Sequence, residues 1–255
     1  MVKKDFLLIF LHGFLGNASD WKIILEDKRL SNYNKLAIDL PGHGNFIPVN
    51  KVNNYSEDII IHYIKDIIKS QLNKDIILIG YSLGAHAALS FVCKYPELVN
   101  ALVLESGTPG IEDPAERINR FKTDNILAKK IKEDYNKFIV GWYNTAIFSS
   151  LSFNPELKEL LTLKRYNNNP NEIIKTLIGF SQGIMIPKWE LLKDLNLPIL
   201  LISGELDKKY TELNKKMQQL LPKSIHKVIK NAGHIPHFEN KYDFIKELDF
   251  FLETL

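Results

Sequence analysis

The sequence predicts an α/β fold, in which a mostly parallel sheet is flanked by helices and interrupted by an all-helical insertion. Short apolar runs alternate with helical patterns through the first part of the chain, as the βαβ units of a parallel sheet require. From residue 107 to 188 the pattern is helical without a convincing strand, and the run Pro198–Gly204 then resumes the sheet. We therefore expect a core of residues 1–106 and 189–255 and a lid of residues 107–188 over the carboxyl ends of the strands.

The individual elements follow from the spacing of the apolar residues. Helix Tyr55–Gln71 has isoleucines and a tyrosine three and four residues apart, which is typical of an amphipathic helix. The strands are short, nearly unbroken apolar runs, as expected when helices cover both faces of a sheet. The expected strands are Phe6–Phe10, the start of Ile38–Gly44 (a strand followed by a turn), Asp75–Ile79, Leu102–Ser106, Pro198–Gly204 and Lys227–Lys230. The other expected helices of the core are Leu83–Lys94 and Asn240–Leu252.

Composition limits the class of protein. With 255 residues, 45% hydrophobic and 25% charged, the chain is typical of one large globular domain. No run approaches the roughly 18 apolar residues that a membrane span needs, and we expect no signal peptide before the first strand. The single Cys93 excludes an internal disulfide and suggests the reducing cytoplasm. A net charge of +3 does not indicate nucleic acid, and no metal-ligand cluster or G-x-G-x-x-G predicts a metal or cofactor.

The pentapeptide Gly80–Gly84 (G-Y-S-L-G) lies between the expected strand Asp75–Ile79 and the expected helix Leu83–Lys94. A buried strand that ends in G-x-S-x-G and turns into a helix is the nucleophile elbow of α/β-hydrolases. The two glycines allow the sharp turn, and the helix N-terminus favours negative charge beside the serine. We therefore predict that Ser82 is the catalytic serine.

An acid and a histidine follow two later strands, in the chain order that this fold uses. Asp207 comes after Pro198–Gly204, and His234 comes after Lys227–Lys230. A serine hydroxyl at neutral pH needs an imidazole to take its proton, and a carboxylate fixes the tautomer of that imidazole. Alone, the aspartate would be interpreted as a loop cap and the histidine as a surface residue. Together with the elbow they predict a Ser82–His234–Asp207 triad.

The tetrapeptide L-H-G-F after the first expected strand predicts the oxyanion hole. In this fold an amide from that loop and the amide after the nucleophile bind the oxyanion. Here these are the backbone N–H groups of Phe14 and Leu83. Such a donor is typically worth about 3 kcal/mol to a developing oxyanion. We expect His12, Asp39 and His43 to brace this region rather than to take part in the chemistry.

The lid carries the information about the substrate. Residues 107–188 contain twelve Lys/Arg and nine Asp/Glu, an excess of +3 that equals the net charge of the whole chain. Three of the four arginines, Arg117, Arg120 and Arg165, lie in this segment. Because arginine binds carboxylates through a planar fork, the lid favours an anionic substrate with more than one carboxylate. The alternative is that these arginines only face water.

Over essentially the whole chain, the sequence resembles the 2-succinyl-6-hydroxy-2,4-cyclohexadiene-1-carboxylate synthases, α/β-hydrolase-fold lyases of menaquinone and phylloquinone biosynthesis. Motifs that many hydrolases share carry part of this resemblance: Phe10–Gly16, Ile38–Gly44, Gly80–Gly84 and Ala232–His234. More specific motifs lie mainly in the lid: Glu105–Gly110, Glu116–Arg120, Gly141–Tyr143 with Phe148, Leu163–Asn169 and Gly204–Tyr210.

The resemblance implies both a reaction and a set of site residues. The reaction is the elimination of pyruvate from 2-succinyl-5-enolpyruvyl-6-hydroxy-3-cyclohexene-1-carboxylate, a small polycarboxylate, by triad-assisted proton abstraction, with no metal or organic cofactor. The implied residues are a triad, two carboxylate-binding arginines and two pocket-lining aromatics: Ser82, Asp207, His234, Arg120, Arg165, Tyr81 and Trp142.

One position departs from the family pattern. After the elbow serine the family continues x-Gly-Gly-Arg, and that arginine binds the anionic substrate, whereas this chain reads Leu-Gly-Ala-His86. At a reference pKa near 6.5, a histidine is mostly neutral at pH 7. Several interpretations stay open. His86 binds the substrate, either through a hydrogen bond or as a cation whose charge the bound carboxylate maintains, or a nearby lysine takes the place of the arginine. Alternatively, His86 only packs on the helix flank, or the substrate is a different one.

Three classes of function stay open at this level. The first is the pyruvate-eliminating lyase, and the second is a serine hydrolase of esters or carbon–carbon bonds with an anionic substrate and Ser82 as nucleophile. The third is a ligand-binding receptor built on a retired hydrolase, against which the intact triad argues. One fold hosts many chemistries, so the fold does not separate the first two. The lid arginines favour the lyase, and the oligomeric state is not predicted.

Overall fold

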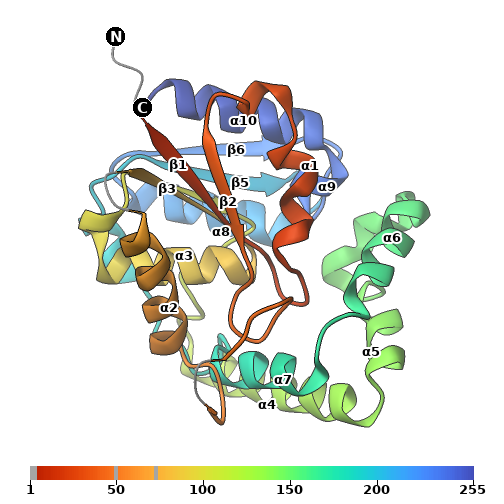
Figure 1. Cartoon of the computed structure of the whole chain (residues 1–255). Helices are drawn as coiled ribbons and strands as arrows, with labels where there is room; N and C mark the ends of the chain where they lie inside the picture. Colours follow the sequence, from red (N-terminus) through yellow and green to blue (C-terminus); the bar gives the residue numbers. More distant parts are fainter. Residues whose placement is uncertain (1–4, 49–50, 72–73) are drawn as a thin grey trace.

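A six-stranded parallel sheet organises the chain in the computed structural model, which describes residues 5–48, 51–71 and 74–255 (Figure 1). The strand order is β2-β1-β3-β4-β5-β6, and all five neighbouring pairs are parallel. The strands are β1 (Phe6–Leu11), β2 (Asn34–Ile38), β3 (Asp75–Tyr81), β4 (Ala101–Glu105), β5 (Ile199–Gly204) and β6 (Ser224–Ile229). The expectation that no signal peptide precedes the first strand concerns residues 1–4, which lie outside the described residues.

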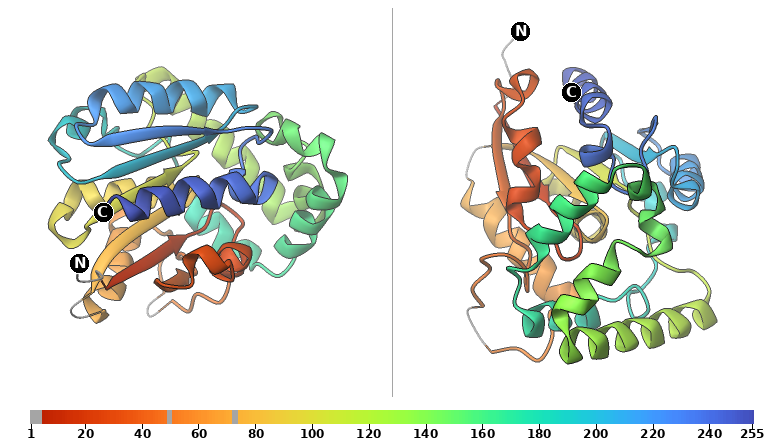
Figure 2. Two further views of the ribbon diagram at one scale, coloured as in Figure 1. Left: turned by 90° about the horizontal axis from the view of Figure 1, so that it is seen from above. Right: turned by 90° about the vertical axis from the view of Figure 1, so that its right-hand side faces the viewer.

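Helices cover both faces of the sheet (Figure 2). On one face lie α2 (Glu57–Ser70), α3 (Leu83–Lys94) and α8 (Lys208–Leu220), and on the other lie α1 (Lys22–Leu25) and α10 (Lys241–Glu253), which follows the short α9 (Pro236–Glu239). Alternate residues of each strand point to opposite faces. Thus Leu7 and Ile9 pack in the cluster under α2 and α3, whereas Leu8 and Phe10 pack in the cluster under α10. This two-sided burial explains the unbroken apolar runs.

The predicted helix Tyr55–Gln71 is confirmed as α2, one or two residues shorter at its ends. The Ser56 side chain caps it by accepting a hydrogen bond from the amide of Ile59. Its buried residues, Ile60, Ile61, Ile64 and Ile68, are the apolar stripe that faces the sheet. The helices expected at Leu83–Lys94 and Asn240–Leu252 are likewise present as α3 and α10.

The two edge strands differ from the prediction. The strand predicted from Ile38 onward ends at Ile38 as β2 and begins four residues earlier, so Asp39–Gly44 is a turn. Strand β6 begins at Ser224 instead of Lys227. Both strands are only partly buried, because each pairs with a single neighbour and exposes one side. Their first residues therefore lack the apolar run on which the prediction rests.

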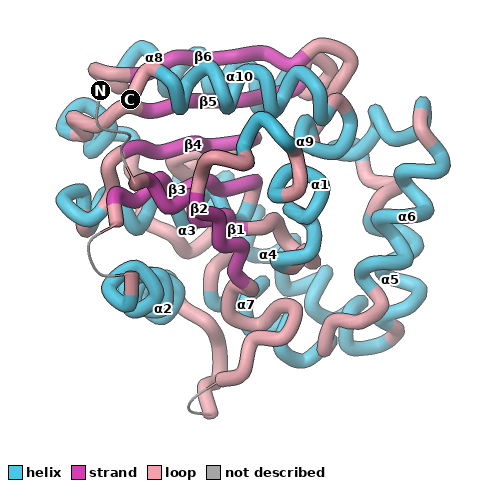
Figure 3. The backbone as a smooth tube through the Cα atoms, turned by 45° about the horizontal axis from the view of Figure 1, so that its top comes forward, coloured by secondary structure: helices cyan, strands magenta, loops and turns pink. Residues whose placement is uncertain are grey.

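Residues 107–188, which we call the lid, contain helices and no strand (Figure 3). The lid helices are α4 (Pro114–Glu133), α5 (Tyr135–Trp142), α6 (Pro155–Arg165) and α7 (Pro170–Gly179), with a 3₁₀ segment at Ala146–Phe153. Three of them begin with proline after a side-chain cap from Asp113, Asn154 or Asn169, a combination that favours helix initiation. No helix among the described residues is long and apolar enough to span a membrane.

Candidate active site

Ser82 lies in a strained turn between β3 and α3. Its φ and ψ are 49° and −107°, a region that non-glycine residues rarely adopt and that often marks functional positions. The flanking glycines make this turn possible, because a Cβ on Gly80 would lie 2.3 Å from the carbonyl oxygen of Gly84. A Cβ on Gly84 would lie 2.3 Å from the carbonyl oxygen of Leu11. The sequence therefore builds the sharp strand–turn–helix that holds Ser82 above the sheet.

The structure brings Ser82, His234 and Asp207 together. His234 Nε2 lies 3.1 Å from Ser82 Oγ, and His234 Nδ1 lies 2.7 Å from Asp207 Oδ2. A carboxylate accepts only, so Nδ1 carries the proton and Nε2 is free to accept the proton of the serine. The His234 side chain is 1% exposed and that of Asp207 8% exposed. The geometry is that of a serine–histidine–acid triad ready to transfer a proton.

Contacts beyond the two hydrogen bonds of the triad position its acid and its histidine. Asp207 caps α8, because its Oδ1 accepts a hydrogen bond from the amide of Tyr210 at 3.2 Å. The ring of Tyr210 lies 4.6 Å from the ring of His234, centroid to centroid. Ser106 Oγ donates to the His234 carbonyl at 3.0 Å, which ties the histidine loop to the end of β4. These contacts fix the position of the imidazole from two sides.

The loop that follows β1, which we call the oxyanion loop because Phe14 is expected to supply an oxyanion amide, lies beside Ser82. Phe14 and Leu83 both line the same cavity as Ser82. Within the described ranges, neither of their amides donates to a protein acceptor, so both are available to a ligand. His12 braces this loop as expected, since its Nε2 accepts from the amide of Leu40 at 2.9 Å and its Nδ1 donates to Gly13. Burial lowers the pKa of His12, so its ring stays neutral.

The cavity in front of the triad has a volume of about 380 Å³ and lies between the core and the lid. Four of the five residues predicted to bind the substrate line it: Tyr81, His86, Arg120 and Trp142. Aromatic rings form part of the wall, with Trp142 5.4 Å from Phe14 and 5.7 Å from Phe148. The site is therefore mostly apolar, with a few polar groups placed on it, as is usual for small-molecule sites.

Arg120 is the guanidinium of this cavity. Its Nε donates to both carboxylate oxygens of Asp124, at 2.9 and 3.0 Å, and the Asp124 side chain is fully buried. Ser181 Oγ donates to the same carboxylate at 2.6 Å. The terminal nitrogens of Arg120 have no protein partner among the described residues, which leaves them available for a carboxylate. Arg120 thus lines the cavity and is oriented through Nε, with its terminal nitrogens left without a protein partner among the described residues.

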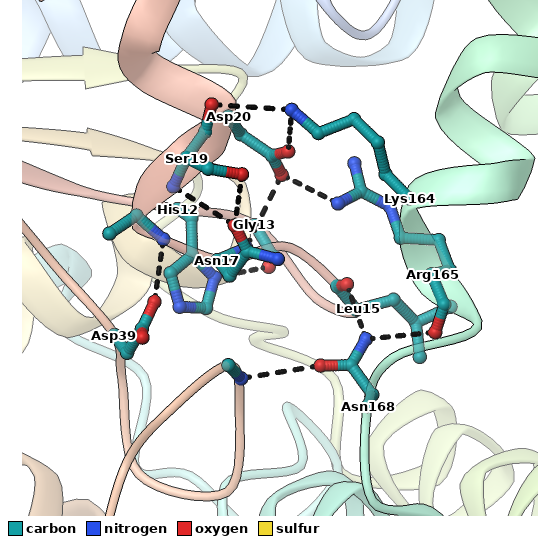
Figure 4. A network of polar contacts seen from close by, with 12 residues as sticks. His12, Gly13, Leu15, Asn17, Ser19, Asp20, Asp39, Lys164, Arg165 and Asn168 are labelled. Carbon is teal, nitrogen blue, oxygen red and sulfur yellow. Dashed lines mark hydrogen bonds and ion pairs between the residues drawn. The ribbon is translucent and has the colours of Figure 1, made fainter.

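The prediction that Arg165 binds the substrate is not supported by its position, because Arg165 does not line the cavity. Its side chain is 5% exposed, and its Nη1 forms an ion pair with Asp20 at 2.7 Å (Figure 4). Its Nε donates to the Tyr143 hydroxyl at 2.8 Å. The physical reason is that Asp20, a buried acid of the core, binds the guanidinium in place of a substrate. Arg117, the third lid arginine, donates to the carbonyls of Ile111 and Glu112.

His86 lines the cavity and is 4% exposed. The amide nitrogen of Gln182 lies 3.2 Å from its Nε2 and donates to it. Burial, followed by the charges of Arg120 and Lys188, lowers the pKa of His86 to about 3. The ring is therefore neutral at pH 7 in the free protein, where it forms a hydrogen bond and carries no positive charge.

This shift predicts a loss of stability in mild acid. The pKa of His86 is about 3 when folded and near 6.5 when unfolded, so the unfolded chain binds more protons between these values. Stability therefore falls as the pH falls through this window. Protonation of His86 in the unfolded chain lowers the free energy of unfolding by about 2 kcal/mol at pH 5.

Denaturant unfolding at pH 7.5 and pH 5 checks this expectation. The His86→Gln variant should lose about 2 kcal/mol less stability than the parent between these two pH values. An equal loss in both proteins would show that His86 is not the group responsible. Burial also lowers the pKa of His12 and His43, so part of the acid sensitivity should persist in the variant.

Several residues of the cavity were not predicted from the sequence. Gln182 and Asp124 act through His86 and Arg120, and Tyr210 packs on His234. Of these residues, only Asp124 could have been predicted from the sequence, because it lies four residues from Arg120 on one helix and this spacing favours an ion pair. Gln182 follows the end of α7, where no local pattern indicates a site.

Comparisons with known proteins agree with this geometry. A family profile described as alpha/beta hydrolase fold matches residues 7–241. A Bacillus subtilis (strain 168) protein, provisionally named 2-succinyl-6-hydroxy-2,4-cyclohexadiene-1-carboxylate synthase, is 32% identical over 97% of this chain and 90% of its own. The synthase of Salmonella paratyphi B is 30% identical over 94% of this chain and 91% of its own. The solved structure of MenH from S. aureus superposes with a TM-score of 0.92 at 31% identity, covering 99% of this chain and 95% of that one. The chain therefore belongs to the α/β-hydrolase fold family and, within it, to the 2-succinyl-6-hydroxy-2,4-cyclohexadiene-1-carboxylate synthases.

Proposed function

We propose that this enzyme is a carbon–oxygen lyase that eliminates pyruvate from 2-succinyl-5-enolpyruvyl-6-hydroxy-3-cyclohexene-1-carboxylate and so forms 2-succinyl-6-hydroxy-2,4-cyclohexadiene-1-carboxylate. The observation that carries the proposal is a triad that faces a cavity lined by Arg120, whose terminal nitrogens have no protein partner among the described residues, in a chain of the synthase family. The triad supplies a base, and the guanidinium suits an anionic substrate.

The triad acts as a proton relay in this reaction. His234 Nε2 takes the proton of Ser82 Oγ, and the serine oxygen removes the ring proton that the succinyl ketone makes acidic. The electron pair moves to the ketone oxygen, where the amides of Phe14 and Leu83 stabilise the enolate. Asp207 stabilises the imidazolium that forms. A positioned base of this kind contributes about 10²- to 10⁴-fold in rate.

Elimination follows from the enolate. Its electron pair re-forms the ketone and the second ring double bond, and the bond between the ring and the enolpyruvyl oxygen breaks. The leaving group takes up a proton and becomes pyruvate. No acyl-enzyme forms and no water attacks, so Ser82 acts as a base rather than as a nucleophile. The same triad would hydrolyse an ester if one were bound in its place.

The cavity residues bind and orient the substrate. Arg120 pairs with a substrate carboxylate through its terminal nitrogens, and Tyr81 and Trp142 form walls beside the ring. His86 accepts or donates a hydrogen bond instead of supplying the charge of the family arginine. Residues 107–188 serve as a lid on a core of residues 1–106 and 189–255. We place the reaction in the cytoplasm, in keeping with the single cysteine.

The decisive experiment is pyruvate release from the enolpyruvyl substrate, generated in situ by the enzyme of the preceding step and followed with a coupled dehydrogenase. We expect release well above the spontaneous rate and dependent on Ser82. Turnover of an activated aryl ester, measured in parallel, should be slow and without a burst. Release at the spontaneous rate together with a fast ester burst would identify a serine hydrolase instead.

A further inference from the structure

Asp20 joins the lid to the loop that follows β1. It lies in the 3₁₀ segment Ala18–Trp21 and is 4% exposed. Its Oδ2 pairs with Arg165 Nη1 at 2.7 Å, and its Oδ1 pairs with Lys164 Nζ at 2.9 Å (Figure 4). Burial opposes the charge, but Arg165 and Lys164 outweigh it and lower the pKa of the carboxyl. One buried carboxylate thus takes two consecutive cations from the end of α6.

The same lid residues hold this loop at further points. Asn168 Nδ2 donates to the carbonyl of Leu15 at 2.8 Å, and Lys164 Nζ donates to the carbonyl of Ser19 at 3.2 Å. On the loop itself, the amide of Asn17 donates to Asp20 Oδ2 at 3.3 Å. Leu15 has a φ of 64°, a conformation that costs energy and persists only where the surroundings impose it. The loop conformation therefore depends on contacts from the lid.

The guanidinium of Arg165 also reaches the wall beside the triad. Its Nε donates to the Tyr143 hydroxyl at 2.8 Å, and the Tyr143 ring packs 4.9 Å from Phe148. The Phe148 ring in turn lies 5.8 Å from the ring of His234. With one donor on Asp20 and another on Tyr143, Arg165 connects the oxyanion loop to the aromatic wall of the cavity.

We propose that Asp20 is a positioning residue for the oxyanion hole, and that Arg165 acts through Asp20 rather than on the substrate. The ion pair holds the loop so that the amide of Phe14, one residue before the strained Leu15, faces the oxygen on which charge develops. The inference rests on the proposed function in taking that amide as an oxyanion donor. It explains why a lid arginine is almost fully buried outside the cavity.

The Asp20→Asn variant tests this role by steady-state kinetics of pyruvate release. We expect kcat to fall about 10- to 100-fold while KM changes less than about threefold, because the substrate contacts remain and one oxyanion donor is displaced. Arg165→Gln should show the same pattern. The double variant should be no slower than the slower single one, because both changes break one contact.

Controls separate this role from general stability and from substrate binding. Lys175→Gln removes another lid ion pair, to Glu172 on α7, and should leave kcat and KM unchanged. Thermal unfolding checks that each variant is folded. If Asp20→Asn alone unfolds, the double variant, which replaces the ion pair with two neutral amides, carries the test. An unchanged kcat, or a loss of kcat in proportion to a lower melting temperature, would overturn the proposal.

A rise in KM for Arg165→Gln with no effect of Asp20→Asn would also overturn it, and would make Arg165 a substrate ligand. Failure of the proposed function looks different, because the parent enzyme would then release no pyruvate. In that case the activated aryl ester replaces the substrate, since its tetrahedral intermediate uses the same two amides. The expected loss of kcat in Asp20→Asn then applies to ester turnover, and its absence would contradict the positioning role of Asp20.

Discussion

Pyruvate release by a Ser82→Ala variant is expected to fall about 10²- to 10⁴-fold in kcat, with little change in KM. In the proposed mechanism the Ser82 oxygen removes the substrate proton after passing its own proton to His234, whose Nε2 lies 3.1 Å away. Without it the imidazole has no relay to the substrate. The variant keeps Arg120, which is proposed to bind a substrate carboxylate, and the amides of Phe14 and Leu83. Substrate binding should therefore be preserved.

Ser90→Ala is the matched control for this variant. Ser90 lies on the same helix, is 1% exposed, and its Oγ has no hydrogen-bond partner among the described residues. Its removal should leave kcat and KM of pyruvate release unchanged. If Ser82→Ala retained more than about a tenth of the parent kcat, a role as the main base would be excluded.

The Arg120→Ala variant should lose about 2–4 kcal/mol of transition-state stabilisation, or about 30- to 1000-fold in kcat/KM. The terminal nitrogens of Arg120 are the free part of a guanidinium held at Nε by the buried Asp124. Losing a charge-assisted, bidentate contact should raise KM and also lower kcat, because the carboxylate fixes substrate orientation. Arg120→Lys keeps the charge without the fork and should be intermediate.

Arg117→Ala is the control on the same helix. This arginine lies three residues earlier on α4, donates to carbonyls of the preceding loop and does not line the cavity. Its kcat/KM should be close to that of the parent. Because Arg120→Ala leaves the buried Asp124 carboxylate without its cationic partner, the melting temperature of this variant must be measured alongside. Parent-like kinetics in a folded Arg120→Ala variant would contradict an anion-binding lid.

The triad could be predicted because its geometry follows from short segments at equivalent places in a parallel sheet. The elbow Gly80–Gly84 begins in the last two residues of the buried strand β3, and the acid and histidine follow the two later strands β5 and β6. The carboxyl ends of parallel strands meet at one edge, so residues placed there converge whatever their distance along the chain. The structure accordingly brings Asp207 and His234 to Ser82.

The contacts of the lid side chains could not be predicted from the sequence in the same way. Its helices are visible in the sequence because capping and proline placement are local signals. The direction in which each side chain points is not a local property. Helix α4 has almost no apolar stripe, and α6 ends at the two cations Lys164 and Arg165 without indicating which surface they meet.

Sequence patterns alone predicted the α/β-hydrolase fold and the triad Ser82–His234–Asp207, because both depend on short local motifs and on their order along the chain. The resemblance of these and the lid motifs to known synthases indicated the family. The folded chain, in contrast, was needed to see which lid arginine lines the cavity. Arg120 pairs through Nε with an acid four residues away and lines the cavity, whereas Arg165 pairs with Asp20, an acid 145 residues away, and does not line it. Burial likewise decided that His86 is neutral, since the pKa of a histidine depends on the groups that surround it.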